Sequence, residues 1–417
     1  MSDTVRFLHT ADLHLDAPFQ GIEASDERVR RELVEATYAA FERVIDTAID
    51  RSVEFIVVAG DVYNNRDKSL RAQLRFQACA KRLADAGIDV FIAQGNHDPA
   101  SGWSAGLELP ASVRYFPVDR IGRFEIERDG EVRCALYGRG YGIGAVTENL
   151  ARTFRREAAD PLAVGVLHAN VGGNTDYEPY APCSLEDLRD ATMDDWALGH
   201  IHKPGVLGTS PEIVYAGSPQ GLNPKEDGPH GCYLVELSAN GAQLEFIETA
   251  SVVWHRAELD LSVCADIGTT RQRVLEECAR VRLEAARPAI MRIDLVGRCD
   301  AHTDLARPGA LEDLIEDVRA GQPAEAPWLW VDRIRDLTRA PIDLDRIREG
   351  ADFAADLVRT TDALLADPEE AATLLGSIVA PVATTLGGYE PKDDPRDLIE
   401  RARDLCLDLL LAEEDAR

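Results

Sequence analysis

Lysine is scarce in this sequence of 417 residues: only five of the 45 basic residues are lysines, and 74 residues are acidic. The resulting net charge of −29 argues against a protein that binds nucleic acid through a basic surface of its own. Three explanations stay open: a small substrate, a positive potential supplied by bound metals or a basic partner, or a general acidity that serves solubility.

Cysteine motifs and long apolar runs are also missing. The eight cysteines are scattered without a Cys-x-x-Cys pair, which excludes a zinc ribbon or a disulfide scaffold and favours reduced structural thiols. The most apolar late stretch, 374–386, is interrupted by Gly376, Ser377 and Pro381 and is shorter than the roughly 20 residues that span a bilayer. No secretory pattern opens the chain. We therefore expect a cytoplasmic protein with no membrane segment.

Short β-rich runs alternate with amphipathic helical stretches in the first half of the chain. Helical spacing of apolar residues predicts helices over 29–48 and 70–83. Continuous apolar runs are typical of strands buried on both faces of an α/β domain. The predicted strands are residues 5–8, 55–59, 90–93, 164–167 and, more weakly, 196–198. This alternation predicts a central sheet covered by helices.

The composition changes near residue 252. A strand at 253–261, a helix at 270–287 and a strand at 289–296 predict a small β-α-β domain, with the basic patch Arg333-Ile334-Arg335 within it or at its edge. Beyond Pro341 the chain reads as helical and carries 19 acidic and 8 basic residues, a net charge of −11. The expected domains are 1–250, 251–340 and 341–417.

The helical C-terminal region carries a narrow apolar stripe on one helix face, formed by Leu398, Ala402, Leu405 and Leu409. Two interpretations are equally open. The stripe either packs on the protein's own domain or docks on the helices of a partner.

Each of the five predicted strands ends in side chains that bind metals. In α/β sheets the carboxyl ends of the strands, and the loops that follow them, form the functional sites. Five of the nine histidines lie in these segments, which scattered core histidines would not do. The segments are Asp12-Leu13-His14, Gly60-Asp61, Gly95-Asn96-His97-Asp98, His168 and Gly199-His200-Ile201-His202.

The spacing within these segments suits coordination. In extended backbone, both side chains of an Asp-x-His or His-x-His pair lie on one face, and the glycines at 60, 95 and 199 permit sharp turns toward a shared centre. Carboxylates, imidazoles and one amide oxygen suit Mn²⁺, Fe²⁺ or Zn²⁺. A bridging carboxylate would place two ions ~3.5–4 Å apart, as in two-metal hydrolases.

The order of these segments resembles that of the calcineurin-like metallophosphoesterase superfamily. Residues 7–16 (Phe-Leu-His-Thr-Ala-Asp-Leu-His-Leu-Asp), 67–76 and 216–219 (Ala-Gly-Ser-Pro) are similar to its DNA-repair exonuclease branch, which includes SbcD-like and, closer still, YhaO-like proteins. Residues 292–298 resemble the cap domain of the YhaO-like group. The resemblance implies a layered α/β domain with a central β-sandwich, a β-α-β cap domain and a helical tail.

The resemblance also implies roles for individual residues. One divalent metal would be held by Asp12, His14, Asp61 and His202, and the other by Asp61, Asn96, His168 and His200, with Asp61 bridging. His97 matches the catalytic histidine of the family, which protonates the leaving oxygen, and Asp98 would orient it.

One position departs from the family pattern. SbcD-type nucleases typically carry a phosphate-contacting histidine three residues after the bridging aspartate, and here that residue is Asn64. An amide can donate a hydrogen bond to a phosphate but carries no positive charge. The substitution puts the rate and the exonuclease preference in question. Asn64 and Arg66 are the candidate substrate-binding residues, and Lys68 is a further basic residue that could compensate.

The function that these features predict is a two-metal, Mn²⁺-dependent DNA exonuclease subunit. It would work in DNA repair or end processing with an SbcC-like coiled-coil ATPase, whose contact would be the acidic tail, and it could form a homodimer. A phosphoesterase for small nucleotides or other phosphodiesters is the first alternative. A scaffold or regulatory subunit with a residual metal site is the second.

Overall fold

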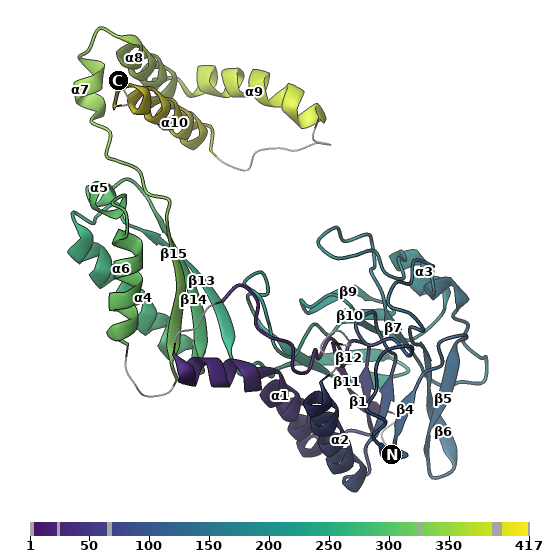
Figure 1. Cartoon of the computed structure of the whole chain (residues 1–417). Coiled ribbons are helices and arrows are strands. Elements are labelled where there is room, and N and C mark those ends of the chain that lie inside the picture. The colour runs from purple at the N-terminus through teal and green to yellow at the C-terminus, as the bar shows by residue number, and fades with distance from the viewer. Residues whose placement is uncertain (1–3, 23–25, 65–68, 323–326, 386–393, 416–417) are drawn as a thin grey trace. The chain divides into compact units, whose positions relative to one another are not determined.

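The computed structural model describes residues 4–22, 26–64, 69–322, 327–385 and 394–415, and divides them into two compact units. The first unit comprises residues 1–259, 271–295 and 308–336, and the second comprises 260–270, 296–307 and 337–417. Figure 1 shows the elements of both units along the chain.

Two six-stranded sheets form the body of the first unit (Figure 1). The first sheet has the order β12-β11-β1-β2-β3-β4, in which β1 to β4 run parallel and β11 pairs antiparallel with β1. Its strands are β1 Val5–Thr10, β2 Phe55–Val58, β3 Asp89–Ile92, β4 Val113–Tyr115, β11 Gly231–Ser238 and β12 Gly241–Glu248. The second has the order β5-β6-β7-β8-β10-β9. Its strands are β5 Gly122–Arg128, β6 Glu131–Arg139, β7 Ala163–His168, β8 Asp195–Gly199, β9 Gly205–Thr209 and β10 Glu212–Tyr215.

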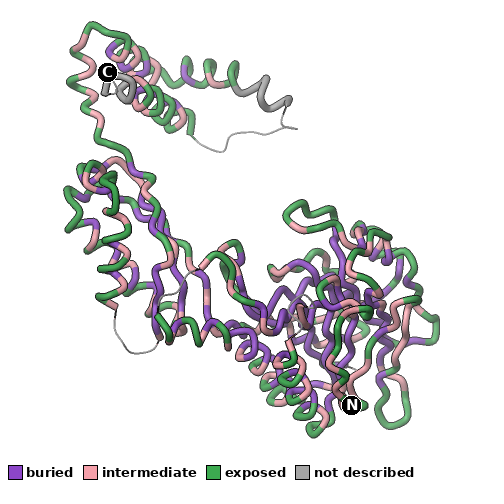
Figure 2. Tube along the Cα trace, viewed as in Figure 1, coloured by how far each residue is buried: buried purple, intermediate pink, exposed green. Residues whose placement is uncertain are grey.

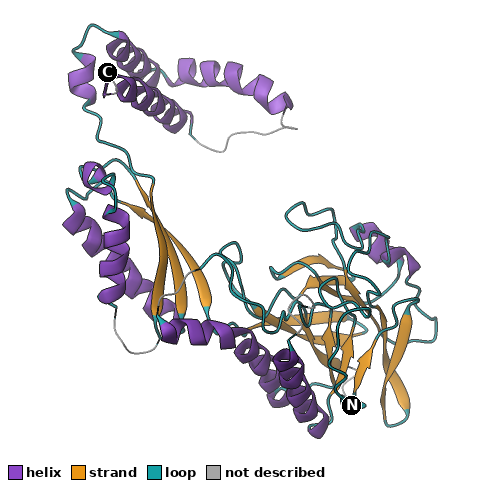
Figure 3. Ribbon diagram, viewed as in Figure 1, coloured by secondary structure: helices purple, strands orange, loops and turns teal. Residues whose placement is uncertain are grey.

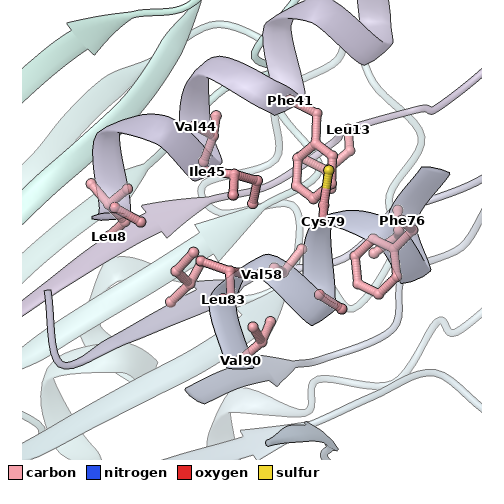
Figure 4. Close-up of a cluster of buried hydrophobic side chains, with 14 of the residues drawn as sticks. Leu8, Leu13, Phe41, Val44, Ile45, Val58, Phe76, Cys79, Leu83 and Val90 are labelled. Atoms are coloured by element: carbon pink, nitrogen blue, oxygen red, sulfur yellow. The ribbon is translucent and has the colours of Figure 1, made fainter. Parts of the chain in front are cut away.

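The two sheets pack face to face, and helices cover the outer faces. Alternate residues of β1 point in opposite directions: Phe7 joins the core between the sheets, and Leu8 joins the core beneath the helices. The helices α1 (Glu27–Asp50) and α2 (Leu70–Asp85) cover the first sheet, where Phe41 and Phe76 stack with ring centroids 5.7 Å apart (Figure 4). The predicted layered α/β fold with a central β-sandwich is confirmed.

The outer face of the second sheet is covered by shorter elements. The 3-10 helix η1 (Ala151–Thr153) and α3 (Leu185–Asp190) lie in the same buried cluster as Trp196, whose indole stacks near Phe154. Figure 2 shows the buried residues concentrated along the strands of both sheets. The sandwich therefore has the layer order helix, sheet, sheet, helix.

A three-stranded sheet follows the sandwich in the chain. It has the order β13-β14-β15, with β14 and β15 parallel. Figure 3 shows helices along one face of this sheet. The elements are β13 Val253–Asp260, α4 Ile267–Ala285, β14 Ala289–Val296, α6 Ala310–Ala320 and β15 Leu329–Asp336. The predicted β-α-β unit is present, and the structure extends it by α6 and by β15, which contains the basic patch.

The first turns of α1 pack against this small sheet. Val29 and Leu33 share a buried cluster with Trp254, Trp328 and Trp330, and the Trp328 indole N–H donates to Glu32 at 2.7 Å. These contacts attach the three-stranded sheet to α1 of the β-sandwich within the first unit.

The second unit is largely helical. Its helices are α5 His302–Leu305, α7 Leu344–Arg348, α8 Phe353–Ala366, α9 Pro368–Thr385 and α10 Pro395–Asp415. Arg298 makes a bidentate ion pair with Asp408 on α10, with both N···O distances at 2.9 Å. The predicted helical character beyond Pro341 is confirmed, whereas the predicted boundaries at residues 250 and 340 stay predictions.

The apolar stripe predicted on α10 is not the buried face of that helix. Leu405 and Leu409 are 55% and 64% exposed, Ala402 is also exposed and Leu398 is half-buried. The buried residues are Ile399, Arg403 and Leu407. The buried face is thus displaced by one or two positions from the stripe, which the described residues leave exposed.

The cysteines and the helices can be compared with what the composition predicted. All eight cysteines are free, and seven of them are buried, in agreement with reduced structural thiols. Among the described residues, no helix is both long enough and apolar enough to cross a membrane.

The buried face of α10 leads to a stability prediction. Leu407 is fully buried, so Leu407→Ala should destabilise the helical unit by about 2–5 kcal/mol. Leu405→Ala, a matched change on the exposed face, should stay within about 0.5 kcal/mol of the unchanged protein. Urea unfolding followed by circular dichroism measures both. Equal destabilisation by the two substitutions would contradict the assignment of faces.

Candidate metal centre

The polar segments at the strand ends converge on one region of the sandwich. The predicted ligands lie in the loops after β1, β2, β3 and β8 and at the last residue of β7. Five of the seven form two overlapping clusters, and within each cluster the candidate coordinating atoms lie within 4.8 Å of one another. The clusters are Asp12 with His14 and His202, and Asp12 with Asp61 and His168. The structure thus brings together side chains from four loops of both sheets.

Asp61 belongs to the second cluster and also lies close to a histidine of the first. Its Oδ2 is 3.8 Å from His14 Nε2 and 3.4 Å from His168 Nε2, so one carboxylate oxygen is within reach of a histidine from each. Asp12 belongs to both clusters by distance, but the His168 nitrogen nearest to it, Nδ1 at 4.0 Å, is hydrogen-bonded elsewhere. The geometry therefore favours Asp61 as the bridging carboxylate.

Each of the four histidines has one ring nitrogen occupied by a partner outside the cluster. This arrangement selects the tautomer and aims the second nitrogen at the centre. The partners of His14 and His202 are side chains, and those of His168 and His200 are backbone carbonyls. The contacts are His14 Nδ1 with Asn64 Oδ1 at 2.9 Å, His168 Nδ1 with Ala59 O at 2.9 Å, His200 Nε2 with Glu178 O at 2.8 Å, and His202 Nδ1 with Glu226 Oε1 at 2.7 Å.

Two of the remaining nitrogens face each other: His14 Nε2 and His202 Nε2 are 3.1 Å apart. Two lone pairs at this distance repel, so a proton or a metal cation must lie between them. Burial lowers the pKa of His202, but its hydrogen bond to Glu226 and the charge of Asp12 outweigh burial and raise the pKa to about 9. The protein favours a positive charge at this point, and the donor set fits a divalent metal there.

Burial lowers the pKa of His14 to about 3 and that of His200 to about 4. Both rings are therefore neutral at pH 7 and offer a lone pair to a metal. Burial opposes the ionisation of Asp61, but His168, His14 and His97 outweigh it and hold the pKa of Asp61 below its ordinary value. The site thus supplies two neutral imidazoles, those of His14 and His200, and the anionic carboxylate of Asp61, which are the forms that bind a divalent metal.

Asn96 occupies the second cluster. Its Oδ1 is 2.9 Å from His168 Nε2, which brings the predicted amide ligand beside the predicted imidazole ligand. His200 is nearby, with its ring centroid 5.1 Å from that of His168. All seven predicted ligands therefore lie in the same region.

The backbone at the site is strained in places that carry ligands. Asp12, His14, Asp61 and His200 have φ values of 50°, 41°, 55° and 100°, a region that side-chain-bearing residues rarely adopt. Such strain gathers at functional sites. The sequence predicted sharp turns from the neighbouring glycines, but not that the ligands themselves would adopt positive φ.

All three predicted glycines are required because the chain approaches too closely for a side chain. A Cβ at Gly60 would lie 2.3 Å from His168 Nδ1. A Cβ at Gly95 would lie 2.3 Å from Asp61 Oδ1, and a Cβ at Gly199 would lie 1.9 Å from Ala59 O. The glycines therefore allow the loops to close around the candidate metal centre.

The two residues predicted to act in catalysis have different environments. His97 is exposed, and its ring centroid is 4.9 Å from that of His14, so it lies at the open side of the centre. Asp98 is buried and accepts hydrogen bonds from the backbone N–H groups of Asp61, Val62 and Gly95 at 3.2, 2.8 and 2.8 Å. No hydrogen bond between Asp98 and His97 occurs in the part of the chain that the structure describes. Asp98 braces the two ligand-bearing loops instead.

Of the candidate substrate-binding residues, the structure describes Asn64. Asn64 accepts from His14 Nδ1, so its amide oxygen is engaged with a predicted metal ligand. Arg66 and Lys68 lie outside the described residues.

Sequence reasoning missed Glu226, the carboxylate that orients His202. Glu226 is buried, and its second oxygen accepts from the Leu222 N–H at 2.6 Å. Its position 24 residues after His202 follows no local spacing rule, so only the folded chain reveals the pair.

Comparison with known proteins identifies the class of protein to which this fold and this site belong. Residues 5–204 match the model of the calcineurin-like phosphoesterases, and the chain is 32% identical over 348 residues to the metallophosphoesterase YhaO of Bacillus subtilis, which covers 83% of this chain and 85% of that protein. The chain belongs to the calcineurin-like metallophosphoesterases.

More particularly, residues 254–339 match the middle domain of the metallophosphoesterase YhaO. Further relatives are more distant. The DNA double-strand break repair protein Mre11 of Haloferax volcanii is 28% identical over 396 residues, which is 88% of this chain and 83% of that protein. The Mre11 protein of Halobacterium salinarum is 28% identical over 307 residues, 72% of each chain.

The close approach at Gly95 gives a prediction for metal content. Gly95→Ala should push Asp61 away from the centre and reduce the bound divalent metal to less than half, measured by elemental analysis of the purified protein. Gly205→Ala is the matched control, because no atom lies within 4 Å of a Cβ at that position. Full metal retention by Gly95→Ala would contradict the role of Asp61 as a ligand.

Proposed function

We propose that this metallophosphoesterase is a two-metal phosphodiesterase that cuts DNA, with Mn²⁺ as the metal. The observation that supports this most directly is the position of Asp61 Oδ2, which lies within 4 Å of a histidine from each ligand cluster. Such an oxygen can bridge two ions at the separation that two-metal hydrolases use. Mixed carboxylate, imidazole and amide ligands suit Mn²⁺, with Fe²⁺ or Zn²⁺ as alternatives.

The proposed ligand sets are those that the family resemblance implies, and they contain the five residues of the two clusters together with Asn96 and His200. Asp12, His14, Asp61 and His202 would hold one ion, and Asp61, Asn96, His168 and His200 would hold the other. When bound, such ions lower the pKa of an attacking water and neutralise charge on the phosphate. The chain's own contribution is to hold the phosphate against these side chains and to keep His14 and His200 neutral.

His97 is the proposed general acid. It is exposed beside His14, where a substrate that reaches the centre would meet it, and a histidine there can protonate the leaving oxygen. The backbone N–H of His97 donates to Asp61 Oδ1 at 2.8 Å, so the proposed bridging carboxylate also fixes the loop that carries the acid. Asp98 supports His97 through this loop rather than through the imidazole.

The proposed substrate and partner come from the relatives and from the tail. The archaeal relatives are named DNA double-strand break repair proteins, which supports DNA as the substrate. The exposed stripe of Leu405 and Leu409 on an acidic helix supports docking on the helices of a basic partner. We assign that partner to the class of SbcC-like coiled-coil ATPases.

A phosphoesterase for small phosphodiesters is the second candidate, because the net charge of −29 opposes the approach of a long polyanion. One assay separates the two. The purified protein with Mn²⁺ is given linear duplex DNA, single-stranded DNA and bis-p-nitrophenyl phosphate, with and without a co-expressed coiled-coil ATPase. Hydrolysis of the small diester alone under both conditions would rule out the nuclease.

The role of His97 can be separated from metal binding. His97→Ala should reduce hydrolysis by about 10²–10⁴-fold, the usual contribution of general acid catalysis, and should leave metal content unchanged. His200→Ala should lose metal as well as activity. Metal analysis beside steady-state rates distinguishes the two variants. Equal metal loss in both would make His97 a ligand instead of the acid.

The exposed stripe on α10 is expected to bind the proposed coiled-coil ATPase. The double substitution Leu405→Glu/Leu409→Glu changes two exposed side chains, so the protein should stay folded and hydrolyse bis-p-nitrophenyl phosphate normally while losing the co-purifying ATPase. Truncation after Pro341 should have the same two effects. Unchanged association in a pull-down with the double variant would refute the docking role of the stripe.

A further inference from the structure

A pocket of about 120 Å³ lies within the first unit, between the open face of the small sheet and the turn that carries Glu226. Its walls come from β13, β14, β15 and the turn. The charged residues that line it include Lys225, Arg256, Arg292, Asp294, Arg333 and Arg335.

The pocket reverses the charge balance of the chain. Lys225, Arg256, Arg292, Arg333 and Arg335 line it together with two acidic residues, Asp227 and Asp294. That is five basic against two acidic side chains, whereas the whole chain has 45 against 74. Asp332 lies outside the lining but pairs with Arg292. If Asp332 is counted as a third acidic residue, five basic residues still leave a surplus of two positive charges.

Internal ion pairs do not use up this surplus. Asp294 serves two arginines: Arg335 donates to it at 2.6 and 2.5 Å, and Arg256 at 3.3 Å. Arg292 donates to Asp332 at 2.7 Å. Within the described ranges, Arg333 and Lys225 make no ion pair, and both are exposed. Arg335 and Arg256 share the single carboxylate of Asp294, and Arg333 and Lys225 make no ion pair among the described residues. The pocket therefore has N–H donors left to bind an anion.

The basic side chains are held in place by regular structure. The strand register sets Asp294 opposite Arg335 and Arg292 opposite Arg333. Arg292 also donates to Gly21 O at 2.8 Å and lies 5.6 Å from the centre of the Trp254 ring. Donors fixed in this way bind an anion with little loss of conformational freedom. Planar guanidinium groups match the geometry of phosphate oxygens.

The pocket is also joined to the metal centre. Lys225 and Asp227 are the direct neighbours of Glu226, whose carboxylate is 2.7 Å from His202 Nδ1. The Asn223 amide and the Leu222 N–H both donate to the same carboxylate, so the turn is rigid. A ligand in the pocket would therefore lie at a defined position relative to a proposed metal ligand.

We infer that this pocket binds a backbone phosphate of a nucleic acid strand, separate from the phosphate that is cleaved. The inference rests on the proposed function, because it requires a substrate with several phosphates. It assigns Arg256 and Arg333 to substrate binding outside the metal centre. A second phosphate contact distinguishes an oligonucleotide from a small phosphodiester.

The test compares the full-length protein with the variant Arg256→Gln/Arg333→Gln. Asp294 keeps Arg335 as its partner in this variant, so the sheet should fold. With Mn²⁺, the KM for a single-stranded oligonucleotide should rise about fivefold to tenfold, while kcat/KM for bis-p-nitrophenyl phosphate stays within about twofold. Arg120→Gln/Arg128→Gln, two exposed arginines outside the pocket, removes the same charge and should leave both substrates unaffected.

Binding without catalysis provides an independent measurement. Fluorescence anisotropy of a labelled oligonucleotide in EDTA should show the same weakening, and the slope of log Kd against log salt should fall by about 0.7, the contribution of one phosphate of a single strand. If the protein cuts no oligonucleotide at all, the nuclease proposal fails and the anisotropy still decides the pocket.

Three outcomes would overturn the pocket assignment. The first is unchanged affinity of Arg256→Gln/Arg333→Gln for the oligonucleotide. If this variant instead no longer co-purifies with the ATPase, the pocket is a contact for that protein. The second is equal weakening by the control variant, which would reflect net charge alone. The third is a parallel fall in hydrolysis of the small diester, which would mean damage to the metal centre.

Discussion

Two buried carboxylates, Asp12 and Asp61, face imidazoles from three loops, and the charge balance of this group governs the rest of the site. Burial raises the pKa of Asp12 to about 6, while the surrounding histidines hold the pKa of Asp61 below its ordinary value. Anionic oxygens this close together need positive charge between them. The protonated His202 provides some of it in the protein alone, and divalent cations at the same place would provide more. Metal binding and the protonation of His202 are therefore competing ways to satisfy one electrostatic demand.

The supporting contacts follow from that demand. A ring nitrogen can meet a cation only if its tautomer and its direction are set, and Asn64, Glu226 and two backbone carbonyls do this for the four histidines. Asp98 then ties together the loops that carry Asp61 and His97. Asn64 fits this scheme: at the position where the resemblance to SbcD-type nucleases implies a phosphate-contacting histidine, Asn64 orients His14, a proposed metal ligand. The change leaves the centre intact and removes one cation from the substrate side.

The parts of the fold that could be predicted are those with local signals. The strands that precede the ligands have continuous apolar runs, and α1 and α2 have clear helical periodicity, so these elements could be located within a few residues. The edge strands β9 and β12 are partly exposed and carry no comparable run. On α10 two apolar stripes lie side by side, and only packing selects Leu407 over Leu405. Glu226 and the positive φ of His200 depend on contacts between loops far apart in the sequence, which no spacing rule encodes.

The net charge of −29 is unevenly distributed, because basic side chains outnumber acidic ones in the lining of the pocket. Charges in water are screened over about 8 Å at physiological salt, so the basic residues of the pocket act on a ligand only near contact. Under the proposed function, a nucleic acid strand would be attracted to the place where Lys225 and the arginines of the small sheet gather. Because the turn that carries Lys225 also carries Glu226, the place that attracts the strand and the place that would cut it are built on one segment. An excess of negative charge elsewhere thus does not exclude the proposed nucleic acid substrate, because the basic residues gather beside the segment that carries Glu226.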